Sequence, residues 1–237
     1  MTHPTGGDLL VAVLRDAGVD TVFGVVSVHN LPLVEAVSRH LRFVPVRHEA
    51  SAVNAADGYA RAGGGLGCAL TSTGTGAGNA AGSLVEALAA GTSVLHVTGQ
   101  VELAHLGSGR GFIHETKDQL GMLHAVSKDA CTIRSVDEAG TVLRDAVRTA
   151  LAVPGGPVSV EWPIDLQYAA HPLLPEQPPV SAPAAVEAPT AAAGAGSTPA
   201  VATEPAGLAD LLELVARAER PVIWAGSGAM FSDSGPE

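Results

Sequence analysis

The chain has 237 residues, of which 46% are hydrophobic, 16% are charged and only 3% are aromatic. Its formal net charge is -11 and no cluster of Lys and Arg stands out, which argues against nucleic acid and against an anionic membrane surface as partners. This length gives room for one domain of ordinary size and a remainder. Ala, Val, Leu and Gly must fill the core, which suits helices packed closely on a sheet.

The beginning of the chain and its cysteines indicate a cellular location. The first ten residues lack a basic region followed by a long apolar stretch, so no secretory signal is expected. The longest Ala- and Leu-rich stretch, 77–90, contains Asn79 and Glu86 and is too short and too polar to span a bilayer. Cys68 and Cys131 lie in short apolar runs, as buried free thiols in a reducing compartment do. These features predict a cytoplasmic protein.

Helix-like and strand-like segments alternate through the first two thirds of the chain. The predicted elements are, in chain order, a helix at 5–17, a strand at 21–26, a helix at 31–40, a strand at 43–47, a helix at 50–62, a strand at 67–72, a helix at 77–90, a strand at 93–98, a helix at 119–125, a strand at 130–134, a helix at 136–151 and a strand at 157–161. The strands are continuously apolar, as in a parallel sheet covered on both faces, and the helices between them imply βαβ crossovers. We therefore expect a doubly wound, mostly parallel α/β sheet with helices on both faces, a three-layer αβα domain, over residues 1–168.

The composition changes after residue 168. Residues 169–207 are dominated by Ala and Pro and have few large apolar side chains, which predicts a disordered linker. A predicted helix at 208–217 and a predicted strand at 221–225 are followed by Gly226-Ser227-Gly228. This pattern is typical of the first βα turn of a second α/β domain, of which residues 208–237 would hold only the start.

A carboxylate stands where a predicted strand meets a predicted helix, in the run Arg47-His48-Glu49-Ala50-Ser51-Ala52-Val53-Asn54-Ala55-Ala56-Asp57-Gly58-Tyr59-Ala60-Arg61. In parallel α/β sheets, ligands bind at the carboxyl ends of the strands. Apolar residues flank Glu49, and partial burial there would favour the neutral acid, a form suited to face a heterocyclic ring nitrogen. From the spacing alone, the alternative is an exposed Glu that interacts with the dipole of its helix.

A glycine-rich turn follows the third predicted strand, in Thr71-Ser72-Thr73-Gly74-Thr75-Gly76-Ala77-Gly78-Asn79-Ala80-Ala81. Gly76, Gly78 and Ala81 match the G-x-G-x-x-G/A dinucleotide pattern. That pattern normally belongs to the first βα turn, with an acidic residue about 20 positions later, where this chain offers only Gln100 and Glu102. The alternative is that the glycines only permit a tight turn and close packing. Both interpretations allow a backbone surface for a flat or anionic ligand.

A further glycine-bounded loop follows the fourth predicted strand, in Gly109-Arg110-Gly111-Phe112-Ile113-His114-Glu115-Thr116-Lys117-Asp118-Gln119. Loops in this position often line sites, but a plain surface loop with a helix-capping Glu is equally compatible with the sequence. The nine histidines of the chain show no metal-ligand spacing, so we expect no metal held by its own side chains.

Together these segments resemble the thiamine-diphosphate enzyme family that includes acetolactate synthases and 2-oxoacid decarboxylases. Three runs match in order, namely Thr21-Val22-Phe23-Gly24-Val25, the run that contains Glu49, and 71–79. The loop at 114–119 and the segment 158–165 fit as well. The resemblance covers 5–166, which corresponds to the N-terminal pyrimidine-binding domain of the family, and 206–231 resembles the start of its central domain.

The resemblance implies a role for Glu49. It would hydrogen-bond the ring nitrogen of the cofactor's aminopyrimidine and so promote removal of the thiazolium proton, after which the thiazolium serves as electron sink for a 2-oxoacid. The other implied contacts are Thr75 and Asn79 around the pyrimidine, and Val28, His29 and His114 towards the substrate.

The sequence departs from the family pattern in two turns. The Pro-Gly-Gly after the first strand is Val26-Ser27-Val28, whose bulkier side chains would narrow or reshape the pocket, and the Gly-Pro-Gly of the third loop is Gly74-Thr75-Gly76. The pairs at 29–30 and 114–115 look closer to decarboxylases of guanidino or other polar 2-oxoacids than to the synthases. Both kinds of chemistry stay open, and the sequence does not name the 2-oxoacid.

One half of the family's active site is missing from the sequence. The family binds the cofactor's diphosphate and Mg²⁺ through a Gly-Asp-Gly…Asn segment in a separate domain, and the cofactor lies between that domain of one subunit and the pyrimidine domain of another. We therefore expect a fragment, a truncated product or one subunit of a split enzyme. It would be inactive alone and would work as a homo- or hetero-oligomer with a diphosphate-binding domain. Two alternatives remain, a non-catalytic α/β assembly module and a nucleotide-binding oxidoreductase domain.

Overall fold

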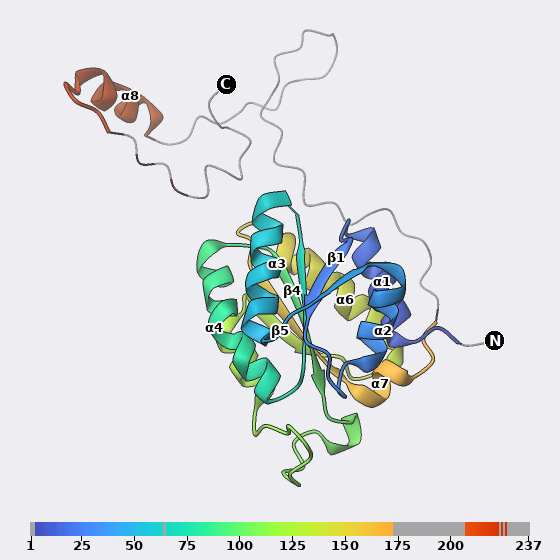
Figure 1. The fold of residues 1–237 in the computed structure, drawn as a ribbon. Helices are drawn as coiled ribbons and strands as arrows, with labels where there is room; N and C mark the ends of the chain where they lie inside the picture. Colours follow the sequence, from blue (N-terminus) through green and yellow to red (C-terminus); the bar gives the residue numbers. More distant parts are fainter. Residues whose placement is uncertain (1–2, 64, 173–206, 223, 225, 227–237) are drawn as a thin grey trace. The chain divides into compact units, whose positions relative to one another are not determined.

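The computed structural model describes residues 3–63, 65–172, 207–222, 224 and 226. They fall into two units, Met1–Pro183 and Ala184–Glu237, each of which is described by itself. In the first unit, strands and helices alternate along the chain (Figure 1). The strands are β1 (Thr21–Gly24), β2 (Arg42–Pro45), β3 (Gly67–Thr71), β4 (Val94–Gln100), β5 (Asp129–Thr132) and β6 (Pro157–Pro163). The helices are α1 (Gly6–Asp16), α2 (Leu31–His40), α3 (Glu49–Gly63), α4 (Thr75–Ala90), α5 (Gln119–Val126), α6 (Val136–Leu151) and α7 (Ile164–Tyr168), with a 3-10 turn, η1, at Leu103–His105.

The six strands form one parallel sheet in the order β2-β1-β3-β4-β6-β5. The longest pairing joins β4 to β6, from Val94 opposite Pro157 to Gln100 opposite Pro163. Every residue of β3, β4 and β6 is buried, whereas the edge strand β2 is partly exposed. The continuous apolar runs in the sequence thus correspond to central strands that are covered on both faces, which confirms the predicted α/β fold with a parallel sheet.

Helices cover both faces of the sheet. On one face, α1, α2 and α6 enclose a core that includes Leu10, Leu14, Leu33, Leu143 and the large side chain of Trp162. On the other face, α3, α4 and α5 form a second core built mostly from Ala side chains, with Leu84 and Leu123. Small side chains let α3 and α4 lie close to the sheet, and this closeness sets the geometry of the residues at their first turns.

Local signals fix the helix ends. Ser135 caps α6 by accepting a hydrogen bond from the backbone N–H of Glu138, and the predicted bounds of this helix are confirmed. The Nζ of Lys128 donates 2.6 Å bonds to the carbonyls of Thr149, Ala152 and Pro154 and so closes its far end. Two predicted helices begin earlier than expected, α3 by one residue and α4 by two. The short elements η1 and α7 were not predicted.

Near the end of its described part, the first unit includes His171. Its backbone N–H donates a 2.8 Å bond to the carbonyl of Pro4, its ring nitrogen Nε2 lies 2.8 Å from the carbonyl of Leu166, and its ring meets Trp162 edge-on. His171 is therefore buried against this unit although the sequence placed it at the start of a linker. The predicted linker at 169–207 otherwise falls on 173–206, outside the described residues, and stays a prediction.

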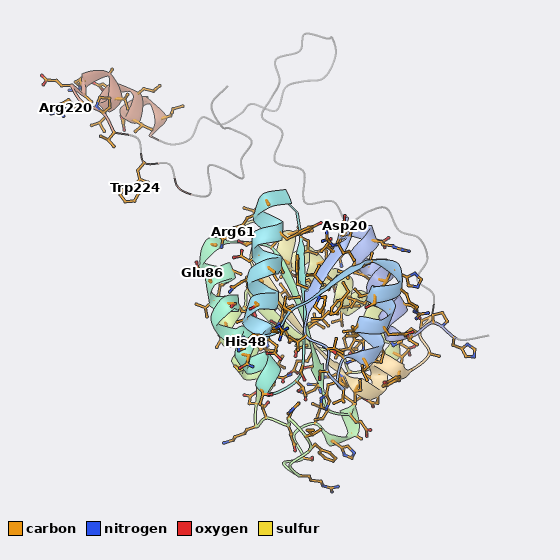
Figure 2. All side chains as sticks on the ribbon, viewed as in Figure 1. Asp20, His48, Arg61, Glu86, Arg220 and Trp224 are labelled. Atoms are coloured by element: carbon orange, nitrogen blue, oxygen red, sulfur yellow. The ribbon has the colours of Figure 1, made fainter. Side chains whose placement is uncertain are left out.

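The second unit contains one described helix, α8 (Leu208–Arg217), which confirms the helix predicted there. Residues 221, 222 and 224 of the predicted strand are not in a strand, and 223 and 225 lie outside the described residues. A strand requires a neighbour to pair with, and the described part of this unit supplies none. Trp224, labelled in Figure 2, is accordingly 95% exposed. Of the helices described in either unit, none is both long and apolar enough to cross a membrane.

Candidate functional site

The strand order places a topological switch point at β1, which has β2 on one side and β3 on the other. Ligands of parallel α/β sheets bind outside the carboxyl ends of the strands at such a point. Two residues labelled in Figure 2 mark the two ends of the parallel strands. Asp20 directly precedes β1 at the amino end, and His48 directly precedes α3 at the carboxyl end. A ligand is therefore expected at the carboxyl ends of the strands, where the loops after β1, β3 and β4 and the first turn of α3 lie.

Glu49 is the first residue of α3 and is only 9% exposed. Its Oε2 accepts a 3.0 Å hydrogen bond from Nδ2 of Asn79, which lies on the neighbouring helix α4. Within the described residues, no hydrogen bond reaches its Oε1. The alternative of an exposed helix-terminal Glu does not describe this side chain. The site instead offers a buried carboxyl group with one oxygen held by an amide and the other open to a ligand.

Gly76 packs closely against this carboxyl group. A Cβ atom at Gly76 would stand 3.0 Å from Oε1 of Glu49 and 2.7 Å from Cβ of Ser72, so any other residue would crowd the carboxyl group. A Cβ atom at Gly78 would meet nothing within 4 Å. Of the two glycines in the dinucleotide-like pattern, only Gly76 is therefore required by close packing, and Gly78 is not.

Thr75 and Asn79 lie one turn apart at the start of α4, and both are exposed. Because Asn79 contacts Glu49, this face of α4 borders the carboxyl group directly. The three residues predicted to surround the pyrimidine thus lie together at the carboxyl ends of the strands. They are Glu49, Thr75 and Asn79.

The residues predicted to face the substrate form a second group. His29, only 6% exposed, follows β1, and its ring lies 5.7 Å from that of His114 in the loop after β4, measured between ring centroids. Burial, and then the nearby ring of His114, lower the pKa of His29. The backbone carbonyl of His29 accepts a 2.8 Å bond from Nε2 of Gln167, which fixes this loop. Val28, next to His29, is 58% exposed.

Gly74 connects the two groups. It has φ +59° and ψ −104°, and a Cβ atom there would collide with the carbonyl oxygen of His114. The loop that carries His114 therefore rests on Gly74, two residues before the glycine that borders Glu49. The structure thus brings the predicted cofactor residues and the predicted substrate residues together around one short turn.

Glu115 organises the loop at 107–117. Its carboxylate accepts hydrogen bonds from the backbone N–H groups of Gly109, Gly111 and Phe112, at 2.9, 2.8 and 3.1 Å. Desolvation would raise the pKa of Glu115, but these donors outweigh it and hold the pKa below its usual value. A cavity of about 330 Å³ lies in this loop. Glu115 is thus a loop clamp rather than a helix cap, with its carboxylate already occupied.

A buried polar cluster beneath these loops was not predicted. Thr73, Gln100, Gln119 and Glu161 are each at most 6% exposed and are hydrogen-bonded to one another. The available signal was an acidic residue, Glu161, inside a predicted strand of mainly apolar residues. Among the described residues, no group of three His, Cys, Asp or Glu side chains could hold a metal ion.

Comparison with known proteins shows which family this chain belongs to. Residues 4–122 match the family model described as thiamine pyrophosphate enzyme, N-terminal TPP binding domain. A probable acetolactate synthase large subunit of Methanocaldococcus jannaschii is 30% identical over 98% of this chain and 37% of its own length. A probable 2-ketoarginine decarboxylase of Pseudomonas aeruginosa is 31% identical over 95% of this chain and 38% of its own.

A solved structure, the thiamine diphosphate-dependent 4-hydroxybenzoylformate decarboxylase of Rhodococcus jostii, superposes with a TM-score of 0.67 at 25% identity. It covers 72% of this chain, which in turn covers 32% of that one. The chain spans about two fifths of the length of the curated relatives it matches. The match over half of the chain shows that it belongs to the thiamine pyrophosphate enzyme family, with residues 4–122 as its N-terminal TPP binding domain.

Proposed function

We propose that this chain binds the aminopyrimidine ring of thiamine diphosphate through Glu49 and supplies that half of an active site for a 2-oxoacid. The observation that carries the proposal is the buried carboxyl group of Glu49, whose Oε2 is held by Asn79 and whose Oε1 accepts no hydrogen bond from the described residues and lies beside Gly76. Because position 76 has no side chain, no Cβ atom crowds Oε1 of Glu49 at this place.

The residues present fit this cofactor. A carboxyl group with one free oxygen can share a proton with a ring nitrogen, and its burial strengthens that hydrogen bond. The bound cofactor would supply an acidic thiazolium carbon and an electron sink for the carbon that loses CO₂. The chain's own contribution would be to orient the ring against α4, to exclude water from Glu49 and to hold the shared proton at its Oε1.

His29 and His114 would face the substrate. Because its pKa is lowered, His29 is neutral near pH 7 and can serve as a hydrogen-bonding group rather than as a fixed cation. Val28 beside it adds an exposed apolar surface. The relatives are named as a synthase of acetolactate and as decarboxylases of 2-ketoarginine and 4-hydroxybenzoylformate, which supports a 2-oxoacid of either kind and leaves its side chain open.

The diphosphate and Mg²⁺ would be held by a separate domain of a homo- or hetero-oligomer. The relatives are more than twice as long as the matched region, which supports a further domain in the working enzyme. On this proposal residues 169–207 are a linker, residues 208–237 begin the central domain, and the chain alone has no decarboxylase or synthase activity.

The proposal is tested by NMR titration of the full chain with 4-amino-5-hydroxymethyl-2-methylpyrimidine, the ring portion of the cofactor. We expect weak binding that moves the amide signals of Glu49, Gly76 and Asn79, and no such movement in the Glu49→Gln variant. A parallel titration with NAD tests the dinucleotide alternative, which predicts movement at Gly76, Gly78 and Ala81 instead. A non-catalytic assembly module would bind neither compound, and either of these outcomes would contradict the proposal.

A further inference from the structure

We infer that Gln119 is a positioning residue for the proposed pyrimidine site and that the buried carboxylate of Glu161 holds Gln119 in place. The inference rests on the proposed function, because what Gln119 positions is the turn beside Glu49. Both residues are almost completely buried and neither belongs to the residues predicted to touch cofactor or substrate. They lie beneath the turn rather than in the space that a ligand would enter.

The side-chain amide of Gln119 uses all of its hydrogen-bonding capacity. Its Oε1 accepts bonds from Oγ1 of Thr73, at 2.9 Å, and from the backbone N–H of Gly74, at 2.5 Å. Its Nε2 donates to the carbonyl of Gly99, at 3.3 Å, and to Oε1 of Glu161, at 2.8 Å. One side chain at the start of α5 thus connects the segments that follow or end β3, β4 and β6.

The neighbours of this amide allow only one orientation. The backbone N–H of Gly74 can only donate, so it requires an oxygen, and the carbonyl of Gly99 can only accept, so it requires the NH₂ group. A rotated amide would set its NH₂ group against the N–H of Gly74 and its oxygen against the carbonyl of Gly99, so both hydrogen bonds would be lost. Gln119 therefore fits this place as an amide of fixed direction and not merely as a polar side chain.

Glu161 supplies the support on the far side. It is 2% exposed, and its carboxylate accepts bonds from Nε2 of Gln100 and of Gln119 and from Oγ1 of Thr132, at 3.1, 2.8 and 2.5 Å. No Lys, Arg or His within the described residues forms an ion pair with it. These three donors offset the cost of burying an acid. A buried polar network with every member satisfied is rigid, so the direction of the Gln119 amide is fixed.

The turn that Gln119 holds is the one that shapes the site. Gly74 is the N-cap residue of α4 and has no side chain with which to cap it, so Gln119 fixes it from another helix. Gly76 follows two residues later and borders Oε1 of Glu49. If the turn shifted by a few tenths of an ångström, the space beside the carboxyl group would change while Glu49 itself stayed in place on α3.

The test compares three variants of the full chain, Gln119→Met, Gln119→Glu, and the double variant Q119E/E161Q. Gln119→Met removes all four bonds, and Gln119→Glu sets two carboxylates against each other. In the double variant, the amide introduced at position 161 donates to the carboxylate introduced at position 119. The carbonyl of Gly99 then loses its donor, and Nε2 of Gln100 loses its acceptor, while the bonds from Thr73 and Gly74 to position 119 are kept. We expect each single variant to bind the aminopyrimidine compound roughly five- to tenfold more weakly, the equivalent of one hydrogen bond. The double variant should bind at least about twofold more tightly than Gln119→Glu, because it restores the bond between positions 119 and 161.

The readouts separate positioning from simple stability. Ser93→Ala serves as the matched control, because it removes a 2.8 Å side-chain bond to the carbonyl of Ala150 before β4 begins, and its binding should equal that of the parent. Thermal unfolding of every variant reports the fold. If Gln119→Met only lowers the unfolding temperature and its folded form binds like the parent, the inference is overturned. Absence of rescue in the double variant, with the fold intact, would also overturn it.

The backbone amide of Gly74 keeps the test independent of the proposed function. Its short bond predicts a downfield proton signal and slow hydrogen exchange in the parent, and faster exchange in Gln119→Met. If the parent binds no aminopyrimidine compound, the proposed function fails, yet this signal still decides whether Gln119 holds the turn. If Gln119→Met changes neither the chemical shift nor the exchange rate of the Gly74 amide proton, the inference is refuted.

Discussion

Nδ2 of Asn79 on α4 lies 3.0 Å from Oε2 of Glu49, the first residue of α3. A hydrogen bond from α4 therefore holds the carboxyl group of Glu49 in place. An amide nitrogen can only donate, and the oxygen that it meets must therefore be an acceptor. Because the carbonyl oxygen of a carboxyl group is the better acceptor, this bond favours a proton on Oε1, on the side of Gly76. The contact thus directs the acidic proton towards the space in which the pyrimidine is proposed to lie.

Replacement of this acid should slow activation of the cofactor. In an assembly of the chain with a diphosphate-binding domain, Glu49→Gln should fold normally, because the two side chains are nearly isosteric. Its amide has no acid proton to share with the ring nitrogen, so exchange of the thiazolium proton with deuterated solvent should slow by roughly 10²–10⁴-fold. Glu86→Gln on the exposed face of α4 is the control. Exchange as fast in Glu49→Gln as in the parent would remove Glu49 from the proposed mechanism.

The two glycines of α4 offer a matched pair of substitutions. Gly76→Ala would place a methyl group 3.0 Å from Oε1 of Glu49, so binding of the aminopyrimidine compound should be lost. Gly78→Ala meets open space within a helix and should leave binding intact while stabilising the chain by about 0.5–1 kcal/mol. NMR titration and thermal unfolding measure both effects. Equal binding by the two variants would show that the space beside Gly76 holds no ligand.

His96 should make the fold sensitive to acid. It is completely buried, with Oγ1 of Thr71 at 2.8 Å from Nε2 and Oγ of Ser159 at 2.9 Å from Nδ1, and desolvation lowers its pKa from 6.5 to about 4. Between these values the unfolded chain binds a proton that the folded chain does not. The free energy of unfolding should therefore fall as the pH drops from 6.5 to 4, by roughly 3 kcal/mol for this group alone.

Urea unfolding of the parent and of His96→Gln between pH 7 and pH 4 measures this contribution. Other groups titrate in both proteins, so the difference between the two pH dependences isolates His96. His40→Gln, at an exposed position that ends α2, provides the control and should keep the pH dependence of the parent. Parallel curves for the parent and His96→Gln would mean that His96 accepts its proton in the folded state.

Limited proteolysis should cut first within 173–206, where the Ala- and Pro-rich composition disfavours a packed core. The stable fragment should begin at or before Pro4 and end after His171, because the backbone bond between these residues ties the two ends together. Mass spectrometry of the fragment locates the cut. A first cleavage between α1 and β6 would contradict this division of the chain.

The sheet and its helices were predictable because the central strands carry their signal locally. The strands β3, β4 and β6 each carry a short run of mainly apolar residues. The ends of α6 are marked by a capping Ser and by the change of pattern after Leu151. The short helix α7 has only five residues, too few for a periodic signal. The strand predicted at 221–225 was wrong at its described residues for a different reason. A segment with a high strand propensity does not form a strand without a partner strand.

The candidate site divides in the same way. Glu49 and Asn79 stand in runs whose residue order alone carries a resemblance, so they could be named in advance. The contact between Gln119 and Gly74 joins residues 45 positions apart, and that between Gln100 and Glu161 joins residues 61 apart. No local pattern encodes a hydrogen bond of such sequence separation. Only the parallel order of the strands brings these side chains beneath one turn.

The bond between the carbonyl of Pro4 and the N–H of His171 has a consequence for how the complete enzyme could be assembled. Since Pro4 and His171 are hydrogen-bonded to each other, the chain enters and leaves this folded part at neighbouring points. In the enzyme proposed above, a diphosphate-binding domain could therefore be joined before Pro4, after His171 or carried on a separate chain without a change in this folded part.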